Sequence, residues 1–167
     1  MAKLDASAVA ALLIEIGRRL VLAGENPYKA RAYSRAAQNL LTLTLPLGEV
    51  IAAGRLREIP GVGEALAATI EQLYARGTTP KLEALRADAP AGVLEMLRIP
   101  GLSPQKVRQI HQVLGIESLA DLESACREGR LRTAKGLGPG LEMKILTGIE
   151  LLRRSGGLRS STQPKSI

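Results

Sequence analysis

The 167-residue sequence contains no tryptophan and no phenylalanine, and its only aromatic side chains are Tyr28, Tyr33 and Tyr74. Proteins that bind single strands or extruded bases usually stack those bases on several aromatic rings, so this composition does not support a stacking platform or a base pocket. The absence does not exclude contact with the backbone or a groove of a nucleic acid.

Cysteine and histidine are almost absent as well. Cys126 and His111 each occur alone, which excludes an internal disulfide and leaves too few ligands for a zinc site. We predict that Cys126 is a small packed side chain, because a helical cysteine without a histidine neighbour is rarely reactive. Asp5 lies where the apolar part of a signal peptide would begin, and no apolar run is long enough to span a membrane. We therefore expect a cytoplasmic protein.

The charge of the chain is unbalanced toward the basic side. Its 23 lysines and arginines face 16 acidic residues, giving a formal net charge of +7. Residues 1–97 carry 11 basic and 10 acidic side chains, whereas residues 98–167 carry 12 and 6. This excess favours a polyanionic partner, nucleic acid before an anionic membrane, although an ordinary basic domain has a similar composition.

The apolar residues recur at steps of three and four, and no stretch shows the alternation of a β-strand. Glycine, proline and capping residues divide this pattern into successive helices. We therefore expect an all-α fold with two small helical subdomains, at residues 1–87 and 88–154. The polar end at residues 155–167 has no apolar periodicity and is predicted to be disordered.

One short pattern occurs three times without gaps. The copies are REIPGVGEALAATI at 57–70, LRIPGLSPQKVRQI at 97–110 and RTAKGLGPGLEMKI at 132–145. Each places a glycine, an apolar residue and a glycine or serine before a helix. Such a turn is too tight for a Cβ at the glycine, and its amides lie at the positive end of the following helix. The pattern predicts an anion site suited to phosphate.

Other glycine motifs fit these segments less well. GVGEAL does not match GxGxxG and follows no strand, and GLGPGLEMK lacks the adjacent Gly-Lys-Ser/Thr of a P-loop. A purely structural helix junction remains the alternative for each copy. It applies above all to the third copy, where Lys135 replaces the proline and Pro139 begins the helix.

The three segments resemble helix-hairpin-helix motifs, which in known families bind the DNA backbone through hairpin amides and often hold a monovalent cation. The resemblance implies Na⁺ or K⁺ at hairpin carbonyls and requires no other cofactor. Ser103 departs from the second glycine of the motif but can still cap the helix. The implied DNA contacts are Gly61, Val62, Gly63, Glu64, Gly101, Leu102, Ser103, Gln105, Gly136, Leu137, Gly138 and Gly140. The implied cation ligands are the carbonyls of Arg57, Ile59 and Val62, and those of Leu97, Ile99 and Leu102.

The order of the parts is more specific than the motif. NPYKARAYSRAAQNL at 26–40, the first hairpin, GTTPKLEALR at 77–86 and the second hairpin with its following GIESLADLESACREGRL resemble the N-terminal region of bacterial family X DNA polymerases, relatives of DNA polymerase beta. The resemblance covers residues 5–154. It implies a helical domain that binds the downstream DNA end with its 5′ phosphate, and a fingers-like domain on the primer side.

The resemblance does not extend to the polymerase chemistry. No Gly-Ser followed by a paired-aspartate strand is present, so these residues cannot carry metal-dependent nucleotidyl transfer. The family removes 5′-deoxyribose phosphate with a lysine whose position is Thr69 here, and a hydroxyl cannot form the required imine. Lys81 and Lys29 remain as weak candidate nucleophiles. The resemblance places Lys29, Arg57 and Lys81 at the 5′ phosphate, and Lys106, Arg108, Lys135 and Lys144 along the duplex backbone.

The sequence therefore predicts a non-enzymatic chain that binds DNA at gapped, nicked or 5′-phosphate ends during base excision repair or gap filling. It would act at the bacterial nucleoid, as the N-terminal region of a polymerase or as a free-standing homologue. A polymerase palm or other repair proteins would be further partners, and a membrane would not. Two alternatives stay open, a 5′-deoxyribose phosphate lyase and a protein-interaction scaffold.

Overall fold

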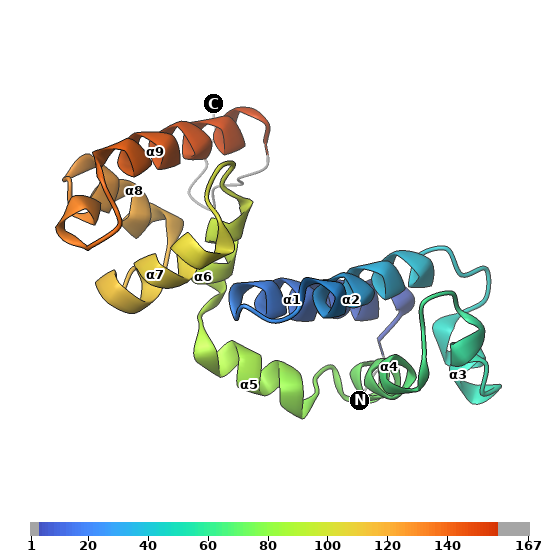
Figure 1. Ribbon diagram of the computed structural model, residues 1–167. Helices are drawn as coiled ribbons and strands as arrows, with labels where there is room; N and C mark the ends of the chain where they lie inside the picture. The colour runs from blue at the N-terminus through green and yellow to red at the C-terminus, as the bar shows by residue number, and fades with distance from the viewer. Residues whose placement is uncertain (1–3, 157–167) are drawn as a thin grey trace. The chain divides into compact units, whose positions relative to one another are not determined.

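The computed structural model describes residues 4–156 (Figure 1). Within this range the secondary structure is helical and contains no strand, which confirms the predicted all-α fold. The chain divides into two compact units, residues 1–88 and residues 89–167, named unit 1 and unit 2 below. Most of the end predicted to be disordered, from residue 157 onward, lies outside the described residues. No described helix is both long and apolar enough to cross a membrane.

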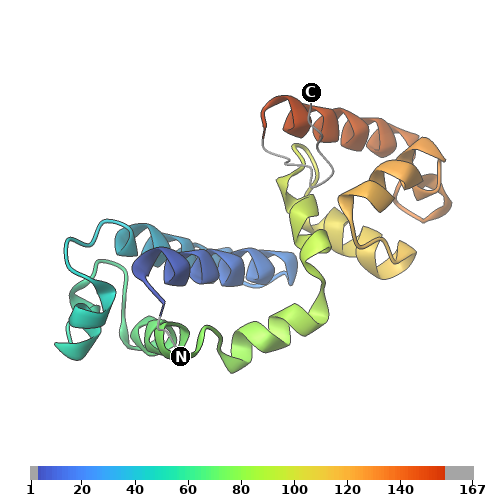
Figure 2. The same ribbon diagram turned by 180° about the vertical axis from the view of Figure 1, so that it is seen from behind.

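Unit 1 begins with two antiparallel helices that lie side by side in both ribbon views (Figures 1 and 2). Asp5 caps the first helix by accepting the Ala8 amide at 2.9 Å. Asn26 caps the second helix, which has a proline in its first turn. The helices of this unit are α1 (Ala6–Leu22), α2 (Pro27–Leu40), α3 (Leu47–Ala52), η1 (Leu56–Glu58), α4 (Glu64–Arg76) and α5 (Pro80–Asp88).

A single core joins the helices of unit 1. Leu13 and Ile16 of α1, Leu40 of α2, Ile70 of α4 and Leu82 of α5 are all almost completely buried. Burial of such side chains contributes about 1.5–3 kcal/mol each to folding. The apolar steps of three and four residues seen in the sequence therefore correspond to the inward faces of these helices.

A charged cluster fixes α5 against α1. Glu15 of α1 accepts a hydrogen bond from Arg19 Nε at 2.7 Å, and from Nε and Nη2 of Arg86 on α5 at 2.8 and 2.7 Å. Hydrogen bonding from Arg86, with a further contribution from Arg19, lowers the pKa of Glu15 to about 2. The carboxylate is therefore ionised at neutral pH and holds the two helices together.

Unit 2 also has a carboxylate bound by two arginines. Glu123 of α8 (Leu119–Arg127) accepts hydrogen bonds from Arg127 and from Arg153 of α9 (Pro139–Arg154). The bonds from Arg153 and then Arg127 lower the pKa of Glu123 to about 2. Cys126 is buried, as predicted, and burial raises the pKa of its thiol to about 11. The helices are α6 (Ala91–Glu95), η2 (Met96–Arg98), α7 (Pro104–Leu114), α8 (Leu119–Arg127), η3 (Leu131–Thr133) and α9 (Pro139–Arg154).

Two glycines of unit 2 allow close packing. A Cβ on Gly92 would collide with the Glu117 carbonyl oxygen, and a Cβ on Gly148 of α9 would lie 2.6 Å from Ile99 Cγ2. These contacts bring the start of α6 against the loop before α8, and α9 against the segment after η2.

Candidate nucleic-acid interface

Three turns of the chain share one backbone conformation, and we name them hairpin 1 (59–63), hairpin 2 (99–103) and hairpin 3 (134–138). Each follows a short 3₁₀ turn, η1, η2 or η3, which the sequence pattern does not indicate. Each begins with a residue in extended conformation. The central glycines have left-handed φ values of 83°, 84° and 84°, which a side chain would strain; they are Gly61, Gly101 and Gly136.

The apolar residue after each glycine stabilises the turn with both its side chain and its backbone amide. Its side chain is buried, and its amide donates to the carbonyl three residues before it, at 3.0, 3.2 and 3.1 Å in hairpins 1, 2 and 3. Because this amide is engaged, a backbone contact from the residue to an outside ligand would use its carbonyl. The residues are Val62, Leu102 and Leu137.

The helices that leave the hairpins begin in two different ways. α7 is capped by its serine, since Ser103 Oγ accepts the Lys106 amide at 3.2 Å. Gly63 and Gly138 are the N-caps of α4 and α9, and no side chain caps either helix. Their first-turn amides therefore have no side-chain acceptor at the positive end of the helix dipole, where an anion is stabilised. Hairpin 3, the weakest copy by sequence, thus has the same open start as hairpin 1.

The glycines at these open starts serve neither a left-handed turn nor close packing inside the chain. Gly63 and Gly138 have φ values of −95° and −127°, which any residue adopts. Gly140, in the first turn of α9, also lacks a left-handed φ. A Cβ on any of the three would meet nothing within 4 Å. Every other glycine between residues 4 and 156 either has a left-handed φ or packs closely against a neighbour.

Within unit 2, the helix that follows each of hairpins 2 and 3 contacts the turn of the other hairpin. From α7, Lys106 Nζ donates to the Gly136 carbonyl at 2.9 Å and Gln109 Nε2 donates to the Lys135 carbonyl at 2.8 Å. From α9, Lys144 Cδ lies 3.2 Å from the place of a Cβ on Gly101. The structure therefore gathers three of the predicted duplex contacts, Lys106, Lys135 and Lys144, beside the two turns.

Hairpin 1 is contacted instead by α2. Asn39 Nδ2 donates to the Pro60 carbonyl at 2.6 Å, and Arg35 Cδ lies 3.3 Å from the place of a Cβ on Gly61. Sequence reasoning missed both side chains. Their spacing of four residues on one helix face was a visible signal, but nothing local connects that face to a turn more than twenty residues later.

Family comparisons agree with this geometry. Residues 5–79 match the helix-hairpin-helix domain model, and residues 93–150 match the model described as a SAM-like helix-hairpin-helix tandem. Two separate segments of the chain therefore match helix-hairpin-helix domain models. It is 28% identical over 138 residues to the DNA polymerase/3′-5′ exonuclease PolX of Bacillus subtilis (strain 168). The alignment covers 83% of this chain but 24% of that polymerase, so the expected relation to the N-terminal region of bacterial family X polymerases is confirmed as distant homology.

Two lysines predicted at the 5′ phosphate come together in unit 1. Lys29 lies in the first turn of α2 and Lys81 in the first turn of α5, both near positive helix ends. Partial burial and the neighbouring Lys29 ammonium lower the pKa of Lys81, while Glu25 opposes this shift. Two cations this close repel each other, so a bound anion would stabilise the pair.

Arg57, the third residue predicted at the 5′ phosphate, lies elsewhere. It lines a hollow of about 350 Å³ beside hairpin 1, together with Glu64 and Glu71. Hairpin 1 meets α2 at Asn39, ten residues and therefore about 15 Å along the helix from Lys29. The structure thus does not place Arg57 with the lysine pair.

Thr69 and the remaining predicted residues occupy ordinary helical positions. The Thr69 hydroxyl donates to the Ala65 carbonyl at 3.1 Å, as threonine in a helix commonly does. Gln105 is exposed in the first turn of α7, and Arg108 is half-buried on the same helix.

A buried carboxylate that sequence reasoning missed holds hairpin 3 in place. Glu142 of α9 is 2% exposed, at the helix position that Ala67 and Val107 fill after the other hairpins. It accepts the Arg132 amide at 3.1 Å and the Arg132 Nε and Nη2 groups at 3.1 and 2.6 Å. These bonds lower the pKa of Glu142, so the start of α9 is tied to η3 by an ion pair.

The predicted cation ligands remain predictions. The carbonyls of Ile59 and Ile99 already accept the turn amides of Val62 and Leu102, but each oxygen keeps a second lone pair for a cation. The side chains of residues 4–156 contain no cluster of histidine, cysteine, aspartate and glutamate that could hold a metal ion. A cation at these hairpins would therefore be bound by backbone oxygen.

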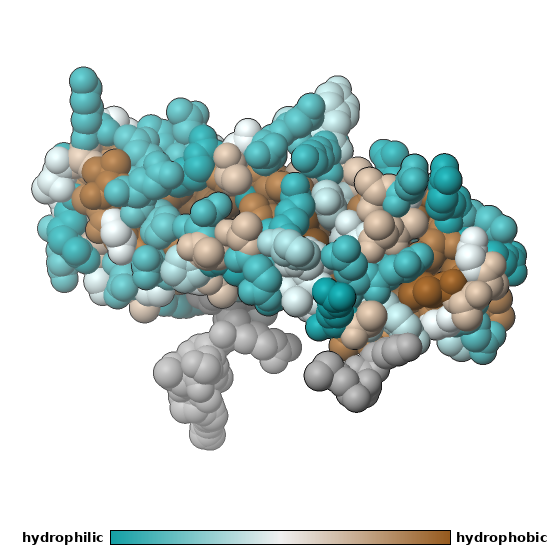
Figure 3. Space-filling model, turned by 90° about the horizontal axis from the view of Figure 1, so that it is seen from below, coloured by the Kyte–Doolittle hydropathy of each residue, from teal (hydrophilic) through white to brown (hydrophobic). Residues whose placement is uncertain are grey.

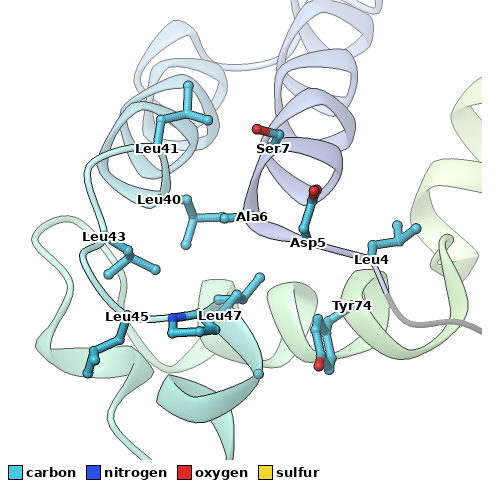
Figure 4. Close-up of a pocket in the computed structure, with 12 residues that line it drawn as sticks. Leu4, Asp5, Ala6, Ser7, Leu40, Leu41, Leu43, Leu45, Leu47 and Tyr74 are labelled. Carbon is cyan, nitrogen blue, oxygen red and sulfur yellow. The ribbon is translucent and has the colours of Figure 1, made fainter.

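A leucine-lined hollow of unit 1 does not coincide with the predicted site. It has a volume of about 460 Å³ and lies at the start of α1, where Leu41, Leu43 and Leu45 line it together with Asp5 and Tyr74 (Figure 4). None of the predicted DNA contacts lines it. On the face shown in Figure 3, hydrophilic side chains predominate and hydrophobic ones form separate groups among them.

Proposed function

We propose that this chain binds DNA independently of sequence, with the phosphate backbone held by the amides at the starts of α4 and α9. Gly63, Gly138 and Gly140 carry the proposal. Glycine at these positions serves neither a left-handed turn nor internal packing, so we assign it to the close approach of a molecule from outside. A phosphate needs that approach, because its oxygens must come within hydrogen-bonding distance of the main chain.

The charge around hairpins 2 and 3 supports this proposal. Among the described residues, Lys106, Lys135 and Lys144 take part in no ion pair. By contrast, Glu123 and Glu142 of unit 2 are each already bound by an arginine. The net positive field beside the two turns therefore comes from lysines that a phosphate backbone can neutralise.

We further propose that the preferred ligand is a gapped or nicked duplex with a 5′ phosphate, bound at the pair formed by Lys29 and Lys81. A terminal phosphate carries more negative charge than an internal one and presents more free oxygens, which suits two adjacent ammonium groups. In this role the chain would act in DNA repair or gap filling, either as the N-terminal region of a longer polymerase or as a free-standing homologue.

A phosphate preference tests this assignment. We expect the chain to bind a gapped duplex with a 5′ phosphate about fivefold to tenfold more tightly than the same duplex with a 5′ hydroxyl, measured by fluorescence anisotropy. The combined substitutions Lys29→Ala and Lys81→Ala should remove the preference. Lys144→Ala is the matched control and should weaken both ligands by a similar factor. A preference that survives loss of both lysines would overturn the assignment.

The lysine pair also favours a second candidate function, a lyase acting on 5′-deoxyribose phosphate. A lowered pKa gives Lys81 more of the neutral amine that attacks an aldehyde. The amine would add to C1′ of the opened sugar, water would leave to form the imine, and β-elimination would release the phosphorylated DNA end. Borohydride would reduce that imine to a stable amine and join protein to DNA.

Trapping separates this lyase from binding alone. If Lys81 is the nucleophile, borohydride should produce a covalent complex with DNA that bears 5′-deoxyribose phosphate, and Lys81→Ala should abolish it while Lys144→Ala does not. The absence of a complex, at a protein concentration that saturates the same DNA, would leave binding as the function.

A further inference from the structure

Few apolar contacts hold α5 in unit 1. Of the nine residues of this helix only Leu82 is buried, and Leu85 is half-buried. At the start of the helix the buried Thr79 hydroxyl accepts the Leu82 amide at 3.1 Å. A surface helix is normally oriented by an apolar stripe that runs along several turns. One buried side chain fixes a point on α5 but not its rotation about its own axis, so its orientation depends on further contacts.

These further contacts are ionic and lie toward the other end of α5. Nε and Nη2 of Arg86 donate to the two carboxylate oxygens of Glu15 on α1, at 2.8 and 2.7 Å. A bidentate pair of this kind fixes the orientation of its partners as well as their distance. Arg19 adds a second link, because its Nε donates to Glu15 at 2.7 Å and its Nη1 donates to the Leu85 carbonyl at 3.4 Å. The Glu15 carboxylate is therefore the centre of the contacts that set the rotation of α5.

The rotation of α5 decides where Lys81 points. Lys81 lies in the first turn of the helix, five residues and therefore about 7.5 Å along the axis from Arg86. Partial burial and the Lys29 ammonium of α2 lower the pKa of Lys81, so the two amines lie close together. Without an anion their positive charges repel each other and act against the docking of α5. The contacts of Glu15 oppose that repulsion.

We propose that Glu15 is a positioning residue for the 5′-phosphate site, because through Arg86 it holds α5 at the rotation that keeps Lys81 beside Lys29 before DNA binds. The inference rests on the proposed function, since the lysine pair is the site that Glu15 prepares. Two charges that are already fixed together bind an anion more tightly than two mobile ones, which would have to be ordered during binding. Glu15 acts on the site from a distance and touches no ligand itself.

The position of Lys81 can be measured without DNA. An NMR titration of the lysine Cε resonances, with the Lys81 signal assigned from its absence in Lys81→Ala, should give a pKa below the ordinary lysine value. In Glu15→Gln the charge that holds Arg86 is lost, and the pKa of Lys81 should rise as the side chain moves away from Lys29 and into solvent. Glu123→Gln removes a carboxylate that two arginines bind in unit 2, and this matched control should leave the pKa of Lys81 unchanged. An unchanged pKa of Lys81 in Glu15→Gln would overturn the proposal.

DNA binding measures what the positioning contributes. In Glu15→Gln and in Arg86→Met the preference of the parent chain for a 5′ phosphate over a 5′ hydroxyl on a gapped duplex should fall to about twofold or less. Arg86 is 41% exposed, so Arg86→Met should fold even if Glu15→Gln does not, and thermal melting checks both.

A conservative variant separates positioning from a loss of stability. Arg86→Lys keeps a cation opposite Glu15 and should restore part of the preference that Arg86→Met loses, while Glu123→Gln should keep all of it. A full preference in folded Arg86→Met would overturn the proposal. A parent chain without any preference would instead contradict the proposed 5′-phosphate site, and the NMR titration would still show whether Glu15 keeps Lys81 beside Lys29.

Discussion

Combining Gly63→Val with Gly138→Val is expected to weaken binding of duplex DNA about 100-fold while the chain remains folded. Each branched side chain would occupy the space through which a phosphate reaches the amides at the start of α4 or α9. A hydrogen bond to a charged group contributes about 1.5–3 kcal/mol, so loss of one site should cost tenfold or more. The two sites are in different units, so their effects should be nearly additive in free energy.

The fold should tolerate both valines. The backbone at Gly63 and Gly138 is extended, as β-branched residues prefer, and a Cβ meets nothing within 4 Å. Loss of a glycine cap costs at most about 1 kcal/mol per helix. Circular dichroism and thermal melting check folding, fluorescence anisotropy measures affinity, and Thr147→Val on the exposed side of α9 is the control.

The outcome also decides between DNA and protein as the partner of the hairpins. A folded double variant with the affinity of the parent chain would mean that the three turns are only helix junctions. The protein-interaction scaffold left open by the sequence would then become the better interpretation. A variant that unfolds would instead be replaced by Gly140→Val, which changes a different open glycine in hairpin 3's helix.

Raising the salt concentration should weaken DNA binding at least as much as the double valine substitution. Each of the seven predicted basic side chains displaces a counterion from the DNA when it contacts a phosphate. The logarithm of the affinity therefore falls by about 0.9 per contact for each tenfold rise in salt concentration. With four to seven contacts in use, affinity should fall about 10²-fold to 10⁴-fold between 50 and 200 mM salt. Anisotropy titrations over a salt series measure the slope.

Single substitutions show whether the slope comes from the assigned lysines. Lys135→Ala and Lys144→Ala should each reduce the slope by about 0.9, because each removes one phosphate contact. Lys165, which belongs to none of the predicted contacts, provides the control when it is changed to alanine. An affinity that does not change with salt would contradict a backbone-dominated mode of binding.

Features that depend on neighbouring residues could be predicted from the sequence. Ser103 was expected to cap a helix, and its side chain accepts the Lys106 amide at the start of α7. The repeated glycines were expected at turns, and Gly61 and Gly101 have the left-handed φ that a tight turn requires. A cap or a turn is a local balance of hydrogen bonds and steric limits, so a few adjacent residues determine it.

Features that depend on tertiary contacts could not be predicted in the same way. Glu142 looks like a surface residue in the sequence, and only the fold buries its carboxylate against Arg132. The contact between Asn39 and Pro60 joins segments whose order along the chain gives no distance. The separation of Arg57 from Lys29 arises for the same reason, because the length of α2 lies between them.

The starts of α4 and α9 have no side-chain cap, which leaves a place for the proposed phosphate in the structure of each helix. A serine at position 63 or 138 could cap its helix as Ser103 caps α7, and alanine at Gly140 would lower the entropy cost of folding. The chain forgoes this stability at both places. If a phosphate takes the role of the missing cap, part of the free energy of DNA binding is also helix-forming free energy. DNA would then act as a structural component that completes both helices and raises the melting temperature of the chain.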